Sequence, residues 1–149
     1  MKFGIFSVVD HYPKELPRTT GQFYAELLEQ VEAAEELGFE SFWIAEHHFH
    51  EYGGIPRPPI WMAAAAQRTR RIRLGAAVVV LPFDHPLRVA EYYAIVDVLS
   101  NGRLELCVGS ELSYVRVVRV TEAATSDAST MHVRAVGQSD PYELPLPLT

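Results

Sequence analysis

Apolar runs alternate with amphipathic segments along the first 110 residues of the chain. Four runs rich in Val, Ile, Leu and Phe predict buried strands, at residues 1–9, 40–45, 72–81 and 103–109. The segments between them carry apolar residues three or four positions apart, the period of a helix that packs on one face. This pattern predicts an α/β fold of four parallel strands joined by right-handed helical crossovers.

Local signals mark the ends of the three expected helices. Thr19 followed by Gln22 has the spacing of a capping box. Pro58 and Pro86 suit the first turn of a helix, where no backbone N–H is required. Residues that favour a left-handed cap end the first and third helices: Gly38, and Asn101 with Gly102. The inner face of the third helix is expected to hold Val89, Tyr92 or Tyr93, Val96 and Leu99.

The pattern changes after Ser110. Residues 111–149 contain eight Ser or Thr, as against seven in residues 1–110. Residues 121–130 show no periodicity, and residues 141–149 contain three prolines. Residues 114–120 predict one more strand at most, and 121–149 are expected to be irregular or loosely attached. We therefore divide the chain into residues 1–110 and a divergent tail, 111–149.

Composition and charge narrow the function classes. The 149 residues are 48% hydrophobic, enough for one globular core, and the formal net charge is −6. A net negative charge disfavours nucleic acid and anionic membranes as partners. Apolar runs are too short to span a bilayer. Cys107 is the one cysteine, so it has no partner within the chain; we expect it to be buried, in a reducing cytoplasm.

An acid and two imidazoles follow the second expected strand directly. Glu46, His47 and His48 come just after the apolar run that ends at Ala45. Titratable side chains at the carboxyl ends of parallel strands are typical of α/β active sites. Two other interpretations stay open from the residues alone: backbone capping at a strand end, or metal binding by Glu46, His48 and His50. The histidines at 11, 85 and 132 are expected to be surface or capping residues.

A set of motifs over about residues 1–109 resembles the bacterial luciferase-like flavin monooxygenases. They are Met1-Lys2-Phe3-Gly4, Glu36-Leu37-Gly38-Phe39, the run from Phe42 to Phe49, the run from Arg73 to Pro82, His85-Pro86-Leu87-Arg88 and Leu99-Ser100-Asn101-Gly102-Arg103. Their order and spacing make the resemblance specific, although each motif alone is weak. It implies the first half of a (β/α)8, or TIM, barrel.

The resemblance also implies a chemistry. In the flavin branch, reduced FMN would react with O2, and one oxygen atom would enter an organic substrate. A sister branch uses a deazaflavin instead. A separate flavin reductase would supply the reduced FMN. The family dimerises through its second and third helices, so a homodimer is expected. The four alanines at 63–66 then permit close helix contact at that interface, and simple helix propensity is the alternative.

Site residues are carried over by position. His47 matches the catalytic histidine beside the flavin, where it would move a proton and stabilise the oxygenated flavin. Ala76 and Ala77 match a pair that lies at the flavin ring with a cis peptide bond between them. Further cofactor contacts are expected from Glu46, Gly109 and Ser110, while His48 and Glu91 would meet across the subunit interface.

The missing second half of a barrel leaves the activity open. One hypothesis is an active monooxygenase; another is a catalytically silent fragment or partner subunit that keeps only the dimer surface; a third is a deazaflavin-dependent oxidoreductase. Glu111 departs from the family pattern beside the expected phosphate site, where an acid is unfavourable. The tail itself is either a divergent half-barrel end or a truncated or frame-shifted sequence.

Overall fold

Seven strands in chain order form one sheet in the computed structural model, which describes residues 1–48, 53–110, 113–120 and 130–135, and 142–145. From residue 110 onward only the backbone is described. The first eight elements are β1 (Gly4–Ser7), α1 (Thr20–Glu36), β2 (Ser41–Ile44), α2 (Pro58–Arg68), β3 (Arg73–Val80), the 3-10 turn η1 (Leu81–Phe83), α3 (Pro86–Ser100) and β4 (Leu104–Ser110).

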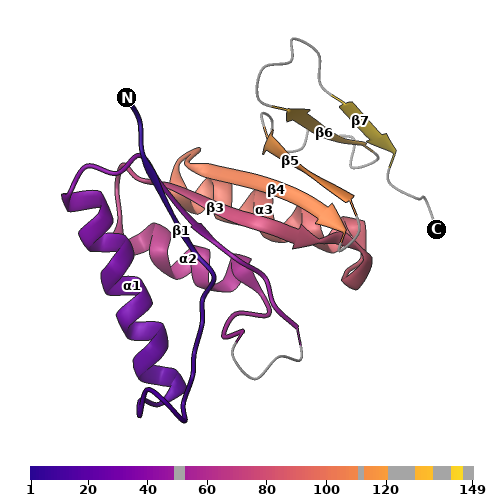
Figure 1. The fold of residues 1–149 in the computed structure, drawn as a ribbon. Helices are drawn as coiled ribbons and strands as arrows, with labels where there is room; N and C mark the ends of the chain where they lie inside the picture. The colour runs from indigo at the N-terminus through magenta and orange to yellow at the C-terminus, as the bar shows by residue number, and fades with distance from the viewer. Residues whose placement is uncertain (49–52, 111–112, 121–129, 136–141, 146–149) are drawn as a thin grey trace.

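The strands β1 to β4 are parallel and adjacent in space, as the alternating pattern predicts. Their register aligns Ser7 with Ile44, Ile44 with Ala76, and Ala76 with Leu106. Figure 1 shows the three helices beside these four strands, with α2 and α3 behind the sheet. The four parallel strands and three helices confirm the predicted half of a barrel.

The core lies between the helices and one face of the parallel strands. Alternate strand residues point into it, which follows from the two-residue repeat of a strand. On this face the buried strand residues are Phe42, Ile44, Leu74, Ala76, Leu104 and Leu106, and they share one core with helix residues that include Leu27, Val31, Met62, Ala65 and Val96. Burying each Leu or Ile side chain stabilises the fold by about 1.5–3 kcal/mol.

The helix ends confirm the predicted signals. The Thr19 side chain accepts from Gln22 N, and the Gln22 side chain accepts from Thr19 N, which completes the capping box. Asn101 adopts the left-handed conformation (φ 56°) that ends α3.

The inner face of α3 holds Val89, Tyr93, Val96 and Ser100. Tyr93 is therefore the inward tyrosine, and Tyr92 is 39% exposed. The expectation that Leu99 faces inward is wrong, since Leu99 is 40% exposed. Eleven positions bring a helix nearly back to the same face, so Ser100 continues the stripe begun by Val89, whereas Leu99 lies about 80° from it.

Three antiparallel strands follow β4: β5 (Ser113–Val120), β6 (Thr130–Ala135) and β7 (Tyr142–Pro145). The strand expected at 114–120 is confirmed. The expectation of irregular structure is wrong for β6 and β7, because strands this short show no clear periodicity in the sequence. The rest of that expectation falls on residues 121–129, 136–141 and 146–149, which lie outside the described residues, as does Glu111.

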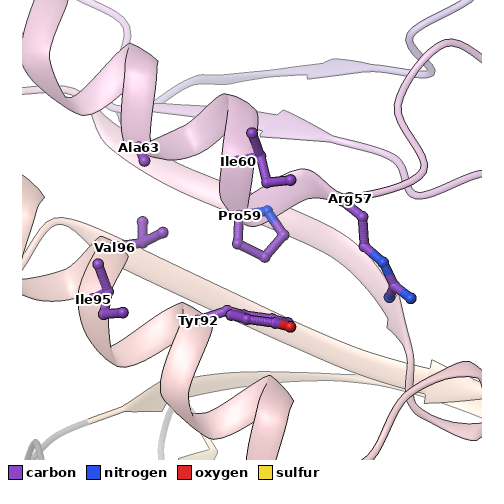
Figure 2. Close-up of a pocket in the computed structure, with 7 residues that line it drawn as sticks. All are labelled: Arg57, Pro59, Ile60, Ala63, Tyr92, Ile95 and Val96. Carbon is purple, nitrogen blue, oxygen red and sulfur yellow. The ribbon is translucent and has the colours of Figure 1, made fainter.

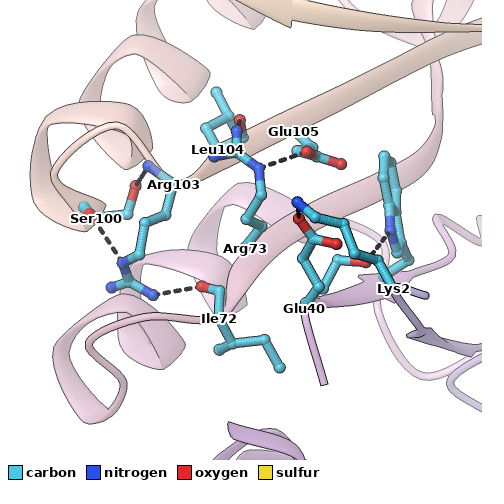
Figure 3. Close-up of polar contacts among 10 residues, drawn as sticks. Lys2, Glu40, Ile72, Arg73, Ser100, Arg103, Leu104 and Glu105 are labelled. Carbon is cyan, nitrogen blue, oxygen red and sulfur yellow. Dashed lines mark hydrogen bonds and ion pairs between the residues drawn. The ribbon is translucent and has the colours of Figure 1, made fainter. Parts of the chain in front are cut away.

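Arg103 connects the helices to the sheet at the end opposite the carboxyl ends of the strands. Its buried guanidinium donates to the backbone oxygens of Ala66, Thr69, Ile72 and Ser100, and to the Thr69 hydroxyl. Figure 3 shows part of this network beside the Arg73–Glu105 ion pair.

Within the described ranges, no helix combines the length and the apolar character needed to cross a bilayer.

Candidate active site

The carboxyl ends of the parallel strands bring the predicted site residues to one edge of the sheet. Ala77 pairs with Cys107 and Val80 pairs with Gly109. Ala45 N donates to Ser7 O, so Glu46 and His47 begin just beyond the edge of β1 and β2. Residues from separate strands therefore meet at one edge, as the sequence pattern predicts for an α/β active site.

Glu46 and His48 form a buried pair at this edge. His48 Nε2 lies 2.6 Å from Glu46 Oε1, and their side chains are 12% and 3% exposed. The His48 ring also meets the edge of Phe83, with ring centroids 5.0 Å apart. The carboxylate and the aromatic ring together fix the orientation of the imidazole.

The predicted contact between His48 and Glu91 lies outside this single subunit. Glu91 Oε2 lies 3.8 Å from Arg88 Nη1 on the exposed side of α3, and its side chain is 52% exposed. A pairing of His48 with Glu91 of another subunit stays a prediction.

His47 lies where three segments of the chain meet. Its backbone N donates to Ile55 O at 3.1 Å, and Gly54 N in turn donates to Val9 O at 3.0 Å. Gly53 packs so closely that a Cβ added there would lie 2.2 Å from His47 Cβ. The half-buried His47 is thus held by the segment that precedes α2 and by the chain that follows β1.

The small residues of β3 lie on opposite faces of the sheet. Ala76 is fully buried in the core beneath the helices, whereas Ala77 is partly exposed. Gly75 lies under the Trp43 indole, where an added Cβ would be 2.2 Å from Trp43 Cε3. Ala77, unlike Ala76, therefore presents its side chain on the face that the helices leave uncovered.

The cis peptide bond was expected between Ala76 and Ala77, and that position is wrong. The structure has a cis bond between Ala77 and Val78. The pairing of β3 with β4 shifts register between Ala77 and Val79, so Val78 is the residue at which the ladder is irregular. The deviation therefore lies one residue closer to the end of the strand than the resemblance implies.

Gly109 and Cys107 place β4 beside this irregularity. An added Cβ at Gly109 would lie 3.3 Å from Val78 Cγ2, so a small residue suits the position. Cys107 is fully buried, as predicted, and burial raises the pKa of its thiol. Ser110 ends β4 and pairs with Ser113. Its role in cofactor binding stays a prediction, because its side chain is not described.

The other histidines have different outcomes. His85 caps α3 by accepting from Leu87 N at 3.2 Å, as predicted. The expectation of a surface or capping role is wrong for His11, which is 7% exposed and stacks on Phe23 at 5.0 Å. The His132 side chain and His50 lie outside the described part. Among the described residues, no group of three His, Cys, Asp or Glu is arranged to hold a metal.

Sequence reasoning missed a polar group beside Glu46. Arg57 Nη1 donates to Asp84 Oδ2 at 2.9 Å, and both residues line a small pocket with Glu46 and Tyr93. Only the inward position of Tyr93 had a signal in the sequence, the helical stripe of α3. Arg57 and Asp84 lie in different loops, so no spacing along the chain links them.

The edge provides what the ring of a flavin needs. Ala77, the adjoining irregular backbone and Gly109 are small and uncharged, so a planar ring can approach closely. Phe6 lies in the same register row as Trp43, is 56% exposed, and adds apolar surface on the face that the helices leave uncovered. His47 supplies a titratable group at the same edge, so the residues present fit the ring-binding part of a flavin site.

Comparison with known proteins agrees with this geometry. A family model described as luciferase-like monooxygenase matches residues 1–127. The oxygenase component of a flavin-dependent trigonelline monooxygenase from Acinetobacter baylyi is 34% identical over 106 residues, which cover 71% of this chain and 29% of that protein.

Two solved structures share the fold. The oxygenating constituent of 3,6-diketocamphane monooxygenase from Pseudomonas putida, in complex with FMN, has 26% identity and a TM-score of 0.69, over 76% of this chain and 30% of that one. The coenzyme F420-dependent tetrahydromethanopterin reductase from Methanopyrus kandleri has 27% identity and a TM-score of 0.57, over 72% and 26%.

The chain spans between 20% and 31% of the length of the curated relatives compared with it. Within that span, the family match extends over the four parallel strands, the three helices and the edge that carries His47. The chain belongs to the luciferase-like monooxygenase family.

Proposed function

We propose that this chain provides the flavin-ring half of a flavin-dependent monooxygenase site. The observation that carries the proposal is the convergence of His47, Ala77 and Gly109 at the carboxyl edge of the parallel strands. FMN is the proposed cofactor, supported by the relative solved with FMN. A deazaflavin is the weaker alternative, with the F420-dependent relative of lower TM-score in its favour.

The side chains have distinct roles in this proposal. Bound reduced flavin supplies the electrons for oxygen chemistry. His47 holds or moves a proton beside the ring, since the reference pKa of an imidazole is near neutral. Glu46 fixes His48 next to it through the 2.6 Å contact. The backbone around Ala77 lets the ring lie close to β3.

The remaining partners follow from the same proposal. The trigonelline relative is an oxygenase component, which supports a separate flavin reductase as the source of reduced flavin for this chain. The substrate is a small organic molecule. The free, buried Cys107 is consistent with a reducing cytoplasm as the proposed location.

We propose in addition that two copies associate through α2 and α3. A groove of about 460 Å3 runs between these helices, and Figure 2 shows its lining of Arg57, Pro59, Ile60, Ala63, Tyr92, Ile95 and Val96. Ile60 is 74% exposed and Ile95 is 57% exposed. A second copy presents the same groove, so Ile60 and Ile95 of each copy would be buried against the groove of the other.

Reoxidation kinetics test the oxygenase function. Reduced FMN is mixed anaerobically with the protein and then with air, and the return of oxidised flavin absorbance is followed. We expect wild type to delay reoxidation relative to free FMN, and His47→Ala to abolish most of that delay. Phe39→Leu serves as the control, because Phe39 lies just before the amino end of β2 and not at the carboxyl edge that carries the site.

Identical reoxidation with and without wild-type protein would contradict the oxygenase proposal. In that case the silent partner subunit becomes the preferred function, and association with a full-length relative is the measurement that supports it.

A further inference from the structure

A small pocket with several polar side chains in its lining lies beside Glu46, between the end of β2 and the inner face of α3. Its lining includes the polar side chains of Glu46, Arg57, Asp84, Tyr92 and Tyr93, and the apolar residues Pro59, Val79 and Val89. The space open to the centre of a water molecule is about 10 Å3. That is about what a single water requires.

Tyr93 brings a buried hydroxyl to this pocket. The residue is 2% exposed, and its Oη has no hydrogen-bond partner among the described residues. Burial raises the pKa of Tyr93 well above its ordinary value, and the nearby Glu46 carboxylate raises it further. The phenol therefore keeps its proton and acts as a donor. A buried hydroxyl without a hydrogen-bond partner is unfavourable, because it has lost its contacts with bulk water.

Glu46 has acceptor capacity to spare on the same pocket. His48 Nε2 lies at one carboxylate oxygen, Oε1. A carboxylate offers about four lone-pair sites. Tyr93 on α3 and Glu46 at the end of β2 thus line one space with room for a single water.

We propose that this pocket binds one water molecule, which accepts a hydrogen bond from Tyr93 Oη and donates one to the Glu46 carboxylate. Tyr93 is then a positioning residue: it orients Glu46, and Glu46 orients His48. The proposal concerns the same site as the proposed function and relies on it only for the role of His48 beside the flavin.

The charged groups around the water come from every element packed against it. Glu46 and His48 follow β2, Arg57 precedes α2, Asp84 follows η1, and Tyr93 lies on α3. Arg57 and Asp84 satisfy each other at 2.9 Å, and their side chains are 41% and 17% exposed. Because Arg57 and Asp84 pair with each other, Tyr93 and Glu46 are the groups of this pocket that the proposed water contacts.

The test uses Tyr93→Phe in the protein without flavin, so that it is independent of flavin binding. The titration of the His48 ring nitrogens is followed by NMR, with Tyr12→Phe as the control, because Tyr12 is an exposed tyrosine that does not line the pocket. Loss of the Tyr93 hydroxyl weakens the hydrogen bond from the water to the Glu46 carboxylate. More of the carboxylate charge then acts on His48 and favours the imidazolium. We expect the His48 midpoint to rise by about 0.3 pH units or more, the equivalent of part of one hydrogen bond.

A folded Tyr93→Phe whose His48 midpoint rises by less, or falls, would overturn the proposal. A second measurement on wild type needs no variant: a long-lived water should give a cross-peak to the Tyr93 ring protons, and its absence also overturns the water site. A failed flavin experiment alongside a positive NMR result would count against the proposed function and leave the water site in place.

Discussion

Arg103 shows how one side chain can hold several segments together. Its guanidinium donates to the last carbonyls around the end of α2, to Ile72 at the start of β3 and to Ser100 at the end of α3. Burial lowers the pKa of Arg103, yet the group remains charged because arginine titrates far above neutral pH. Its partners are four backbone oxygens and the Thr69 hydroxyl.

Replacement of Arg103 by Met keeps much of the stem but removes every one of these donors. We expect a loss of about 3 kcal/mol in the free energy of unfolding, because buried carbonyls are left without partners. Urea denaturation followed by circular dichroism measures it. Arg88→Met is the control, because the Arg88 side chain is 63% exposed and its ion pair with Glu91 is long, at 3.8 Å. An equal loss of stability in both variants would contradict the role given to Arg103.

Glu35 gives stability that depends on pH. Burial raises the pKa of its carboxyl, but the backbone N–H groups of Ile72, Arg71 and Arg70 outweigh this and hold the pKa below its ordinary value. A lowered pKa in the folded state stabilises the protein above the unfolded pKa of about 4.3, and the stability is lost as pH falls through the folded pKa.

Replacement of Glu35 by Gln should therefore cost about 1 kcal/mol at pH 7, a figure reduced for solvent screening of this partly exposed group. The difference from wild type should shrink as pH falls below 5. Urea midpoints across the pH range measure it, with the exposed Glu36→Gln as control. A difference that stays constant between pH 7 and pH 3 would rule out the carboxylate as its source.

At the scale of elements, the boundaries of α1 and α3 were largely predictable. Thr19 with Gln22, and Asn101 with Gly102, satisfy backbone groups at the helix ends through contacts close in sequence. The prediction that Leu99 faces inward was wrong, because the buried face of α3 is set by all the residues on that face and continues to Ser100. The expected cis bond was carried over by position from the family resemblance, and the structure has it at the next bond, Ala77–Val78.

Removal of the Thr19 hydroxyl tests the capping box directly. Thr19→Ala should lower the free energy of unfolding by about 1 kcal/mol, since Gln22 N loses its acceptor. Thermal unfolding of this variant is compared with that of Thr20→Ala, where the change falls on the first residue of α1 rather than on the cap. Equal melting temperatures in the two variants would show that the box adds nothing.

At the scale of the whole molecule, the half-barrel and the site edge were visible in the sequence, but the pocket behind Glu46 was not. The strand-end position of Glu46 and His47 follows from the alternation of strands and helices. Arg57, Asp84 and Tyr93 come together only when α3 packs on the sheet. The strands β6 and β7 escaped prediction because their pairing is set by neighbouring strands.

Association through α2 and α3 predicts a clear effect of charge in the groove. Ile95→Asp should shift the protein toward monomer, with the dimer dissociation constant raised 100-fold or more, because a carboxylate would be buried in an apolar contact. Sedimentation velocity over a range of protein concentrations measures it. Leu37→Asp, on the 77% exposed end of α1, is the control; wild type that is monomeric at every concentration would refute the interface.

Equilibrium binding of reduced FMN tests the central claim most directly. The account predicts saturable anaerobic binding, with a dissociation constant on the order of 10 μM, weakened at least tenfold by Ala77→Leu, which fills the ring face of β3. Ala33→Leu, on the exposed side of α1, should bind as wild type does. Absence of saturable binding by wild type, or equal affinity in the Ala77 and Ala33 variants, would contradict a flavin site at this edge.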